Sequence, residues 1–94
     1  MRSSEADTIR FDQAAGLFAA GYETGQVDDL IADRIVPTLQ AYERGGSGVR
    51  ITAEELGEAT FRIGRRGYEA RAVDAFLDKV AAQLRKYESP VTGG

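Results

Sequence analysis

The sequence contains one pattern twice, and this repetition limits the possible folds more than any other feature. The stretch GYETGQVDDLI begins at Gly21, and the stretch GYEARAVDAFL begins at Gly67. The two stretches share Gly-Tyr-Glu, then Val-Asp, then a pair of large apolar residues. A pattern that recurs in this way indicates that one supersecondary unit is present in two copies.

Each Gly-Tyr pair is followed by apolar residues at helical spacing. In the second copy this spacing predicts a long helix over about 70–88. Its apolar positions are Val73, Phe76, Leu77, Val80, Leu84 and Tyr87. The corresponding positions of the first copy, where the spacing slips by one residue, are Val27, Ile31, Ile35, Leu39 and Tyr42.

Pro37 offers a physical reason for the slip in the first copy. A proline inside a helix lacks an N–H group and clashes with the carbonyl group four residues earlier. We therefore expect a kink near residues 33–37. The helix should continue to about Arg44, where Gly45 and Gly46 supply a C-terminal cap.

A short helix is expected before each Gly-Tyr pair. Thr52 and Glu55 form a capping-box pattern, which predicts the start of a helix over about 53–60. The matching stretch of the first copy is DQAAGLFAA, with Asp12 as its N-cap and Gly21 at its end. Residues 8–11 could equally form a short extended segment.

These elements predict a single all-α domain over residues 1–94. Two short-helix/turn/long-helix repeats would pack in the manner of a coiled coil. The first repeat covers about 8–44 and the second 51–88. A linker at 45–50 joins them, and a disordered tail follows at 89–94.

The composition excludes several classes of function. The chain has no cysteine and no histidine, which removes the commonest metal ligands and the usual general base. We therefore predict no catalytic site, metal, cofactor or small-molecule substrate. The net charge of −3 argues against nucleic-acid binding. No apolar run approaches the roughly 20 residues of a membrane span, and the first residues lack a signal peptide's apolar core, so we expect a cytoplasmic protein.

Gly21 and Gly67 occur where a short helix must turn into a long one. Such a corner suits the positive φ angles that glycine adopts at low cost. Tyr22 and Tyr68 follow the glycines and are expected to pack as staples in the corner. A direct binding role for the two tyrosines is the alternative.

The second copy carries the only basic cluster of the chain, Arg62, Arg65 and Arg66, in the turn before its Gly-Tyr pair. These arginines could stay solvated, or they could contact an anionic lipid surface or an acidic partner. They could also pair with acidic residues of the first copy, namely Glu23, Asp28 or Asp29. We favour the lipid or partner contact and expect Phe18, upstream of the first Gly-Tyr pair, to join it.

The apolar stripes can close within one chain or between two. Some 25 residues separate the two long helices, enough to return along a helix of roughly 30 Å, so the copies can pack parallel in an intrachain pseudodimer. The acidic first copy would then meet the basic second copy. A homodimer with shared stripes is the other possibility.

The segment ITAEELGEATFRIGRRGYEARAVDAFLDKVAAQL, residues 51–84, resembles the N-terminal domain of DivIVA, a bacterial division and polar-growth scaffold, particularly its actinobacterial forms. The shared pattern is a threonine-started short helix, a phenylalanine, an Arg-Gly-Tyr turn and Val-Asp-x-Phe-Leu opening a long helix. Residues 17–42 match more faintly, as a degenerate copy. The resemblance implies a non-enzymatic domain that dimerises through a parallel coiled coil and touches the inner membrane with its turn.

One departure from the family changes the expected contact. In the family the turn presents an exposed Phe-Arg pair before Gly-Tyr, whereas here Arg65 stands in the place of the phenylalanine and Arg66 matches the arginine. An electrostatic contact at the inner face of the membrane, at septum or pole, is therefore expected, with division or polar-growth proteins as partners. The alternatives are a soluble adaptor that binds a partner helix or peptide without membrane contact, and a small DNA-binding regulator.

Overall fold

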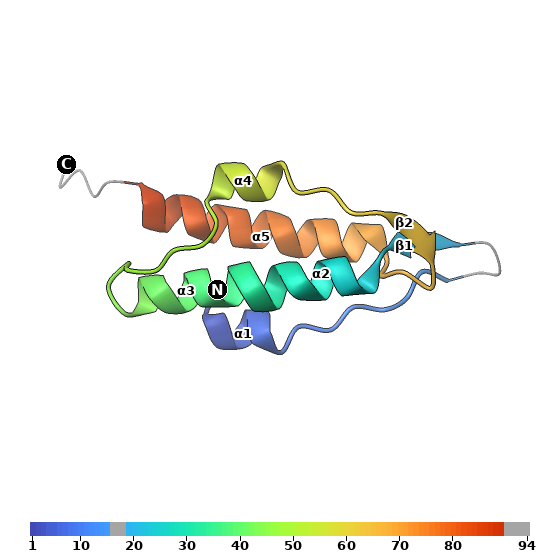
Figure 1. The fold of residues 1–94 in the computed structure, drawn as a ribbon, viewed down its shortest axis with the longest axis horizontal. Helices are drawn as coiled ribbons and strands as arrows, with labels where there is room; N and C mark the ends of the chain where they lie inside the picture. Colours follow the sequence, from blue (N-terminus) through green and yellow to red (C-terminus); the bar gives the residue numbers. More distant parts are fainter. Residues whose placement is uncertain (16–18, 90–94) are drawn as a thin grey trace.

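Two long helical rods form the body of the molecule. The computed structural model describes residues 1–15 and 19–89. The first rod consists of α2 (Thr24–Leu30), the π-helical turn η1 (Ile31–Ile35) and α3 (Val36–Glu43), and the second rod is α5 (Ala70–Glu88). The rods lie side by side and run in the same direction (Figure 1). The whole molecule is elongated, with principal extents of 53 × 21 × 18 Å.

Shorter elements cover the rods and join them at one end. Helix α1 (Ser3–Asp7) packs on η1 and α3, and α4 (Ala53–Gly57) packs on α5. Strands β1 (Ala20–Tyr22) and β2 (Ile63–Arg65) form an antiparallel pair where α2 and α5 begin (Figure 1). The expectation of an all-α fold is thus met in part: the described chain is mostly helical and also contains a small two-stranded sheet.

Both helices predicted in residues 51–88 are present. Helix α5 has the predicted bounds, and α4 ends slightly earlier than expected, at Gly57. The capping box at the start of α4 is confirmed. The backbone N–H of Glu55 donates to Thr52 Oγ1, and the N–H of Thr52 donates to Glu55 Oε1, both at 3.1 Å.

The short helix expected in the stretch DQAAGLFAA is wrong over its described residues. Residues 12–15 are not helical, and residues 20–22 form β1. The backbone groups of this segment bond to the chain before α5 instead. The N–H of Ala14 donates to Gly67 O, and the N–H of Glu69 donates to Asp12 O, both at 2.9 Å. Asp12 therefore caps no helix, and the short helix of this half of the chain is α1.

The irregularity expected near Pro37 takes the form of a π-helical turn directly before the proline. The N–H of Val36 donates to Ile31 O, five residues back, and the additional residue in this turn accounts for the slip in apolar spacing. Because Pro37 has no N–H, the carbonyl group of Asp33 lacks its usual helical partner. The guanidinium of Arg50 donates to this carbonyl at 3.1 Å.

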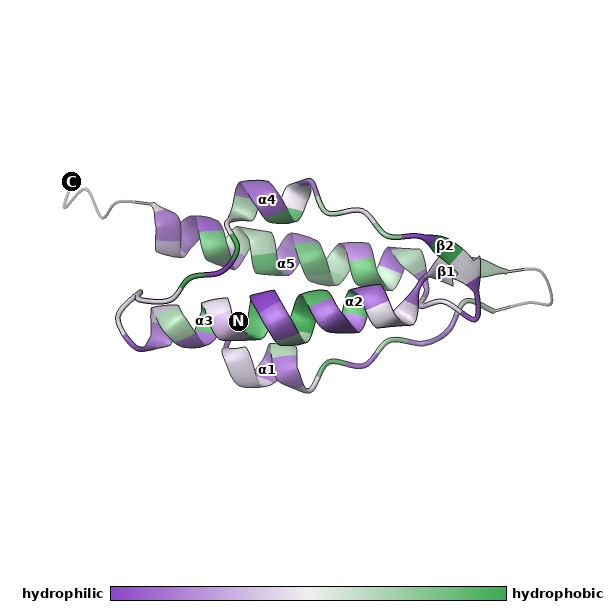
Figure 2. Cartoon of the chain, in the orientation of Figure 1, coloured by the Kyte–Doolittle hydropathy of each residue, from purple (hydrophilic) through white to green (hydrophobic). Residues whose placement is uncertain are grey.

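The two apolar stripes are buried against each other within one chain. Figure 2 shows hydrophobic and hydrophilic residues alternating along both rods. The buried positions are Val27, Ile31, Ile35, Leu39, Val73, Phe76, Val80 and Leu84, while Leu77 is half-buried. Each side chain of this size contributes roughly 1.5–3 kcal/mol when fully buried. This seam is therefore the main source of stability in the described structure.

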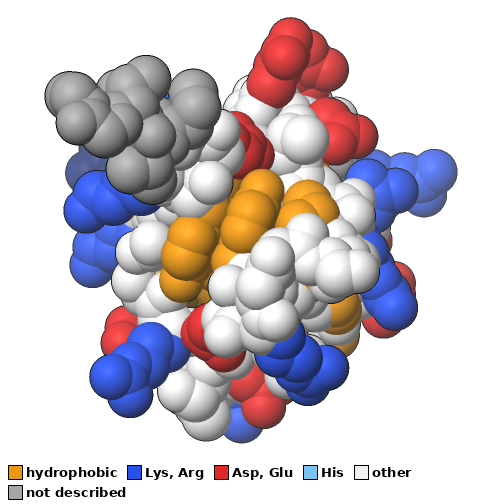
Figure 3. All heavy atoms as spheres, turned by 90° about the vertical axis from the view of Figure 1, so that its left-hand side faces the viewer, with side chains coloured by type: hydrophobic (Ala, Val, Ile, Leu, Met, Phe, Trp, Pro, Cys, Tyr) orange, Lys and Arg blue, Asp and Glu red, His pale blue; other side chains and the backbone are white. Residues whose placement is uncertain are grey.

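The rods end on a pair of stacked tyrosines. The rings of Tyr42 and Tyr87 lie 4.5 Å apart between centroids and 7° from parallel. Figure 3 views the molecule from this end and shows a small hydrophobic patch surrounded by charged side chains. The predicted C-terminal cap of the first rod is confirmed, since Gly45 and Gly46 have φ angles of 114° and 96° and the N–H of Gly46 donates to Ala41 O.

One buried polar side chain fixes the return connection between the rods. Thr38 is fully buried in α3, and its Oγ1 accepts the N–H groups of Arg50 at 2.9 Å and Ile51 at 3.1 Å. These bonds hold the chain against the first rod just before it enters α4.

We expect Thr38→Val to lower the free energy of unfolding by about 1–3 kcal/mol, because it leaves two backbone N–H groups without an acceptor. Urea unfolding followed by circular dichroism measures this. Thr60→Val, the same change at an exposed position, serves as the control and should stay within about 0.5 kcal/mol of the original protein. Equal effects of the two substitutions would contradict the role of Thr38.

Candidate functional site

The candidate site lies at the end of the rod where the two Gly-Tyr pairs cross. The N–H of Tyr22 donates to Tyr68 O at 2.9 Å, and the N–H of Tyr68 donates to Tyr22 O at 2.8 Å. Gly21 and Gly67 meet backbone to backbone at this crossing. A Cβ atom on Gly21 would lie 2.7 Å from the carbonyl carbon of Gly67, and one on Gly67 would lie 2.5 Å from Tyr22 O.

The expected reason for these two glycines is therefore wrong. Neither has a positive φ angle; among the described residues, the glycines that do are Gly45, Gly46 and Gly48. Gly21 and Gly67 are required because the two backbones approach too closely for any side chain.

The two tyrosine side chains reach across to the opposite rod. The hydroxyl of Tyr22 donates to Asp74 Oδ1 at 2.9 Å, and the hydroxyl of Tyr68 donates to Asp28 Oδ1 at 2.8 Å. These hydrogen bonds, followed by burial and the carboxylate charge, raise the pKa of both tyrosines above the ordinary value. Both hydroxyl groups are thus engaged in holding the rods together.

Aromatic contacts complete this packing. The ring of Tyr22 lies 5.1 Å from that of Phe61, and the ring of Tyr68 lies 5.3 Å from that of Phe11. Such tilted pairs add to the stability gained from burial alone. The tyrosines therefore lie as the staple interpretation expects, with a hydroxyl contact that the sequence did not reveal.

The arginine turn, residues 62–66, is fixed through its backbone. The N–H of Arg62 donates to the side chain of Gln26 at 2.7 Å, and its carbonyl oxygen accepts the N–H of Glu23 at 2.9 Å. The next residues pair with β1, with Arg65 opposite Ala20. Arg66 then takes a left-handed conformation with φ of 60°, which is uncommon for a residue other than glycine.

The side chains of the arginine turn extend into solvent. Arg62, Arg65 and Arg66 are all exposed. Asp28, one of the acidic residues considered as their partners, accepts the Tyr68 hydroxyl instead. The turn therefore presents three positive charges from a fixed backbone.

Ile63 lies in the same turn, and the sequence did not reveal its exposure. Its side chain is 61% exposed, the most exposed large hydrophobic side chain among the described residues. The signal was available in principle, because alternate residues of a strand point to the same face and Ile63 therefore shares a face with Arg65. Recognising it required the knowledge that residues 63–65 form a strand. Phe18, the other apolar residue expected here, lies outside the described residues.

Residues 1–15 and 19–89 contain neither a candidate metal site nor a candidate membrane span. No group of three or more acidic residues there could hold a metal ion. None of the described helices is both long and apolar enough to cross a membrane. Comparisons with family models, with curated proteins and with solved structures found no match for this chain.

We expect Gly21→Ala and Gly67→Ala each to destabilise the protein by about 3 kcal/mol or more, since the added methyl group meets backbone atoms that cannot move aside. Gly64→Ala is the control in the neighbouring strand, where a Cβ atom meets nothing within 4 Å, and it should be neutral or stabilise by up to about 1 kcal/mol. Chemical unfolding of the three variants tests this. Normal stability of the Gly21 and Gly67 variants would contradict the close crossing.

The tyrosine contacts predict a loss of stability in alkaline solution. A tyrosine whose pKa is raised in the folded chain stabilises it fully below the unfolded pKa of about 10, and this contribution is lost as the pH rises through the raised value. The free energy of unfolding should therefore fall above about pH 10. In a Tyr22→Phe, Tyr68→Phe variant this fall should be shallower, as measured by urea unfolding across the pH range. Identical pH profiles would contradict the prediction.

Proposed function

We propose that this chain is a non-enzymatic, DivIVA-like localisation or scaffolding module that contacts the anionic cytoplasmic face of a bacterial membrane through its arginine turn. The observation that carries the proposal is the exposure of Arg62, Ile63, Arg65 and Arg66 in one turn whose backbone is held by β1 and α2. Division or polar-growth proteins at the septum or pole would be its partners. The rod would serve as a rigid stem that presents the turn to the membrane.

The composition of the turn suits an anionic lipid surface. Each arginine near such a surface contributes on the order of 1 kcal/mol. Ile63 can enter the interfacial region of the membrane and add an apolar contribution to the binding free energy. This contribution compensates for the absence of phenylalanine at position 65. The total binding free energy from these side chains is small for a single copy of the chain, so stable attachment would need several copies acting together.

The fold is proposed to be a pseudodimer of two repeats in one chain, packed in the manner of a parallel coiled coil. Matched contacts support this. The N–H of Ser3 donates to a Glu43 carboxylate oxygen, and the N–H of Ala53 donates to a Glu88 carboxylate oxygen, both at 2.8 Å. The Tyr–Asp hydrogen bonds and the Phe–Tyr ring contacts are matched in the same way, because each occurs once in either half of the chain. Only the second repeat carries the arginines, so the module would have one basic tip.

The test is sedimentation with liposomes that contain an anionic phospholipid. Arg65→Glu with Arg66→Glu should abolish sedimentation, because it replaces two attractive charges with two repulsive ones. Helicity should remain intact, since both side chains are exposed.

The matched control is Arg85→Glu with Lys86→Glu, which makes the same charge change at exposed positions at the far end of α5. It should sediment almost as the original protein does. Failure of the original protein to sediment, or equal losses in the two variants, would overturn the lipid contact.

A further inference from the structure

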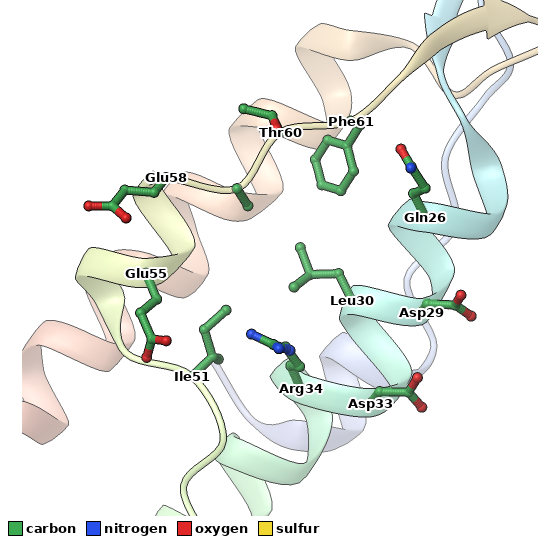
Figure 4. Close-up of a pocket in the computed structure, with 11 residues that line it drawn as sticks. Gln26, Asp29, Leu30, Asp33, Arg34, Ile51, Glu55, Glu58, Thr60 and Phe61 are labelled. Atoms are coloured by element: carbon green, nitrogen blue, oxygen red, sulfur yellow. The ribbon is translucent and has the colours of Figure 1, made fainter.

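A hollow with a volume of about 420 Å³ lies along the side of the molecule, between the α4 half of the chain and the first rod. Leu30, Ile51 and Phe61 point into it from different segments (Figure 4). Its volume falls within the range of roughly 300–1,000 Å³ that is typical of ligand pockets. We call it the first hollow. Its floor is apolar apart from the side chain of Arg34, which also points into it.

The edges of the first hollow are acidic. Asp29 and Asp33 extend outward from α2 and η1 on one side of the hollow, and Glu58 extends outward on the opposite side, where α4 ends, while the side chain of Arg34 points into the hollow (Figure 4). With Glu55 and Arg34, the lining carries four carboxylates and one guanidinium, a net charge of −3. An apolar floor between two acidic edges is complementary to an apolar stripe between two rows of cations.

A second hollow of about 290 Å³ serves as an internal comparison. It lies between the α1 half of the chain and α5, where Phe11 and Phe76 occupy places like those of Phe61 and Leu30. Its charged lining residues are Glu5, Arg10 and Lys79, so its net charge is +1. The same kind of packing therefore forms without acidic edges. Glu55 belongs to the capping box of α4, but this packing does not explain Asp29, Asp33 and Glu58.

The carboxylates are spread along the edges and do not converge on a point. No group of three or more of them in the described chain is close enough to hold a metal ion. A ligand that uses them must carry cations at several positions. A polypeptide with repeated lysine or arginine residues meets this requirement, and a single small cation does not.

We propose that the first hollow binds a basic amphipathic segment of a partner protein, with large apolar side chains on the floor and lysine or arginine residues along both edges. This is helix-in-groove recognition in which the groove is acidic and the bound segment is basic. The site does not include the arginine turn, so the proposal goes beyond the membrane contact and stands or fails independently of it.

The experiment uses a synthetic amphipathic peptide of leucine and lysine, about 14 residues long or about four helical turns, titrated into the isotope-labelled protein. Backbone amide shifts in the nuclear magnetic resonance spectrum should concentrate at Leu30, Ile51 and Phe61 and should decrease with added salt. The same peptide with glutamate in place of lysine should cause no shifts. No shifts with the lysine peptide, or shifts concentrated at Phe11 and Phe76, would overturn the proposal.

A pair of variants distinguishes the effect of the carboxylates beside the hollow on peptide binding from the effect of the protein's total charge. Asp29→Lys with Asp33→Lys should weaken binding of the lysine peptide at least about tenfold. Asp7→Lys with Asp78→Lys makes the same charge change at exposed positions outside the hollow and should alter binding by no more than about twofold. Equal losses in the two variants would mean that the peptide binds through net charge alone, and the proposal would be wrong.

Two further measurements separate this site from others. Arg65→Glu with Arg66→Glu should keep or strengthen peptide binding even where it loses liposome binding, so failure of one proposal is distinguishable from failure of the other. Light scattering across a concentration series tests whether a second copy occupies the hollow. A mass that rises with concentration, and that Asp29→Lys with Asp33→Lys returns to the monomer value, would assign the hollow to a second copy and overturn the proposed partner.

Discussion

The close crossing of Gly21 and Gly67 is the constraint on which the rest of the structure depends. Because neither residue has a side chain, the two backbones can exchange reciprocal hydrogen bonds between Tyr22 and Tyr68. Both rods leave this crossing in the same direction, so they start at one level and run parallel. Each tyrosine hydroxyl then bonds to an aspartate of the opposite rod, which limits rotation of one rod about the other. The apolar stripes face each other as a result.

The polar contacts direct the fold, and the buried stripes supply most of its stability. At the other end of the rods, Glu43 and Glu88 accept N–H groups at the starts of α1 and α4, and hydrogen bonds from Ser3 lower the pKa of Glu43. Each large side chain in the seam contributes roughly 1.5–3 kcal/mol, which is more than a hydrogen bond at an exposed helix start supplies. These hydrogen bonds and the tyrosines therefore select one packing among those that burial alone would permit.

The sequence predicted those features that depend on local residues. Helix α5 follows from apolar periodicity, α4 from the Thr52 and Glu55 pattern, and the end of the first rod from Gly45 and Gly46. It did not predict β1 and β2, because strands of three residues have no measurable periodicity and their hydrogen bonds join distant segments. The same pairing displaced the short helix expected after Asp12. The exposure of Ile63 was missed for this reason, since it depends on the strand.

The arrangement of charge suggests how the two proposed surfaces would act together. The arginine turn begins at Arg62, directly after Phe61 of the first hollow, and Gln26 contributes both to the hollow and to the hydrogen bond that holds Arg62. A cationic segment in the hollow would therefore lie near the positive charge of the turn and be repelled by it. Anionic lipid bound at the turn would neutralise that charge and remove the repulsion. Because coupling between two sites is reciprocal, a basic partner and the lipid surface would each strengthen binding of the other, so the module would favour its partner where the membrane is close.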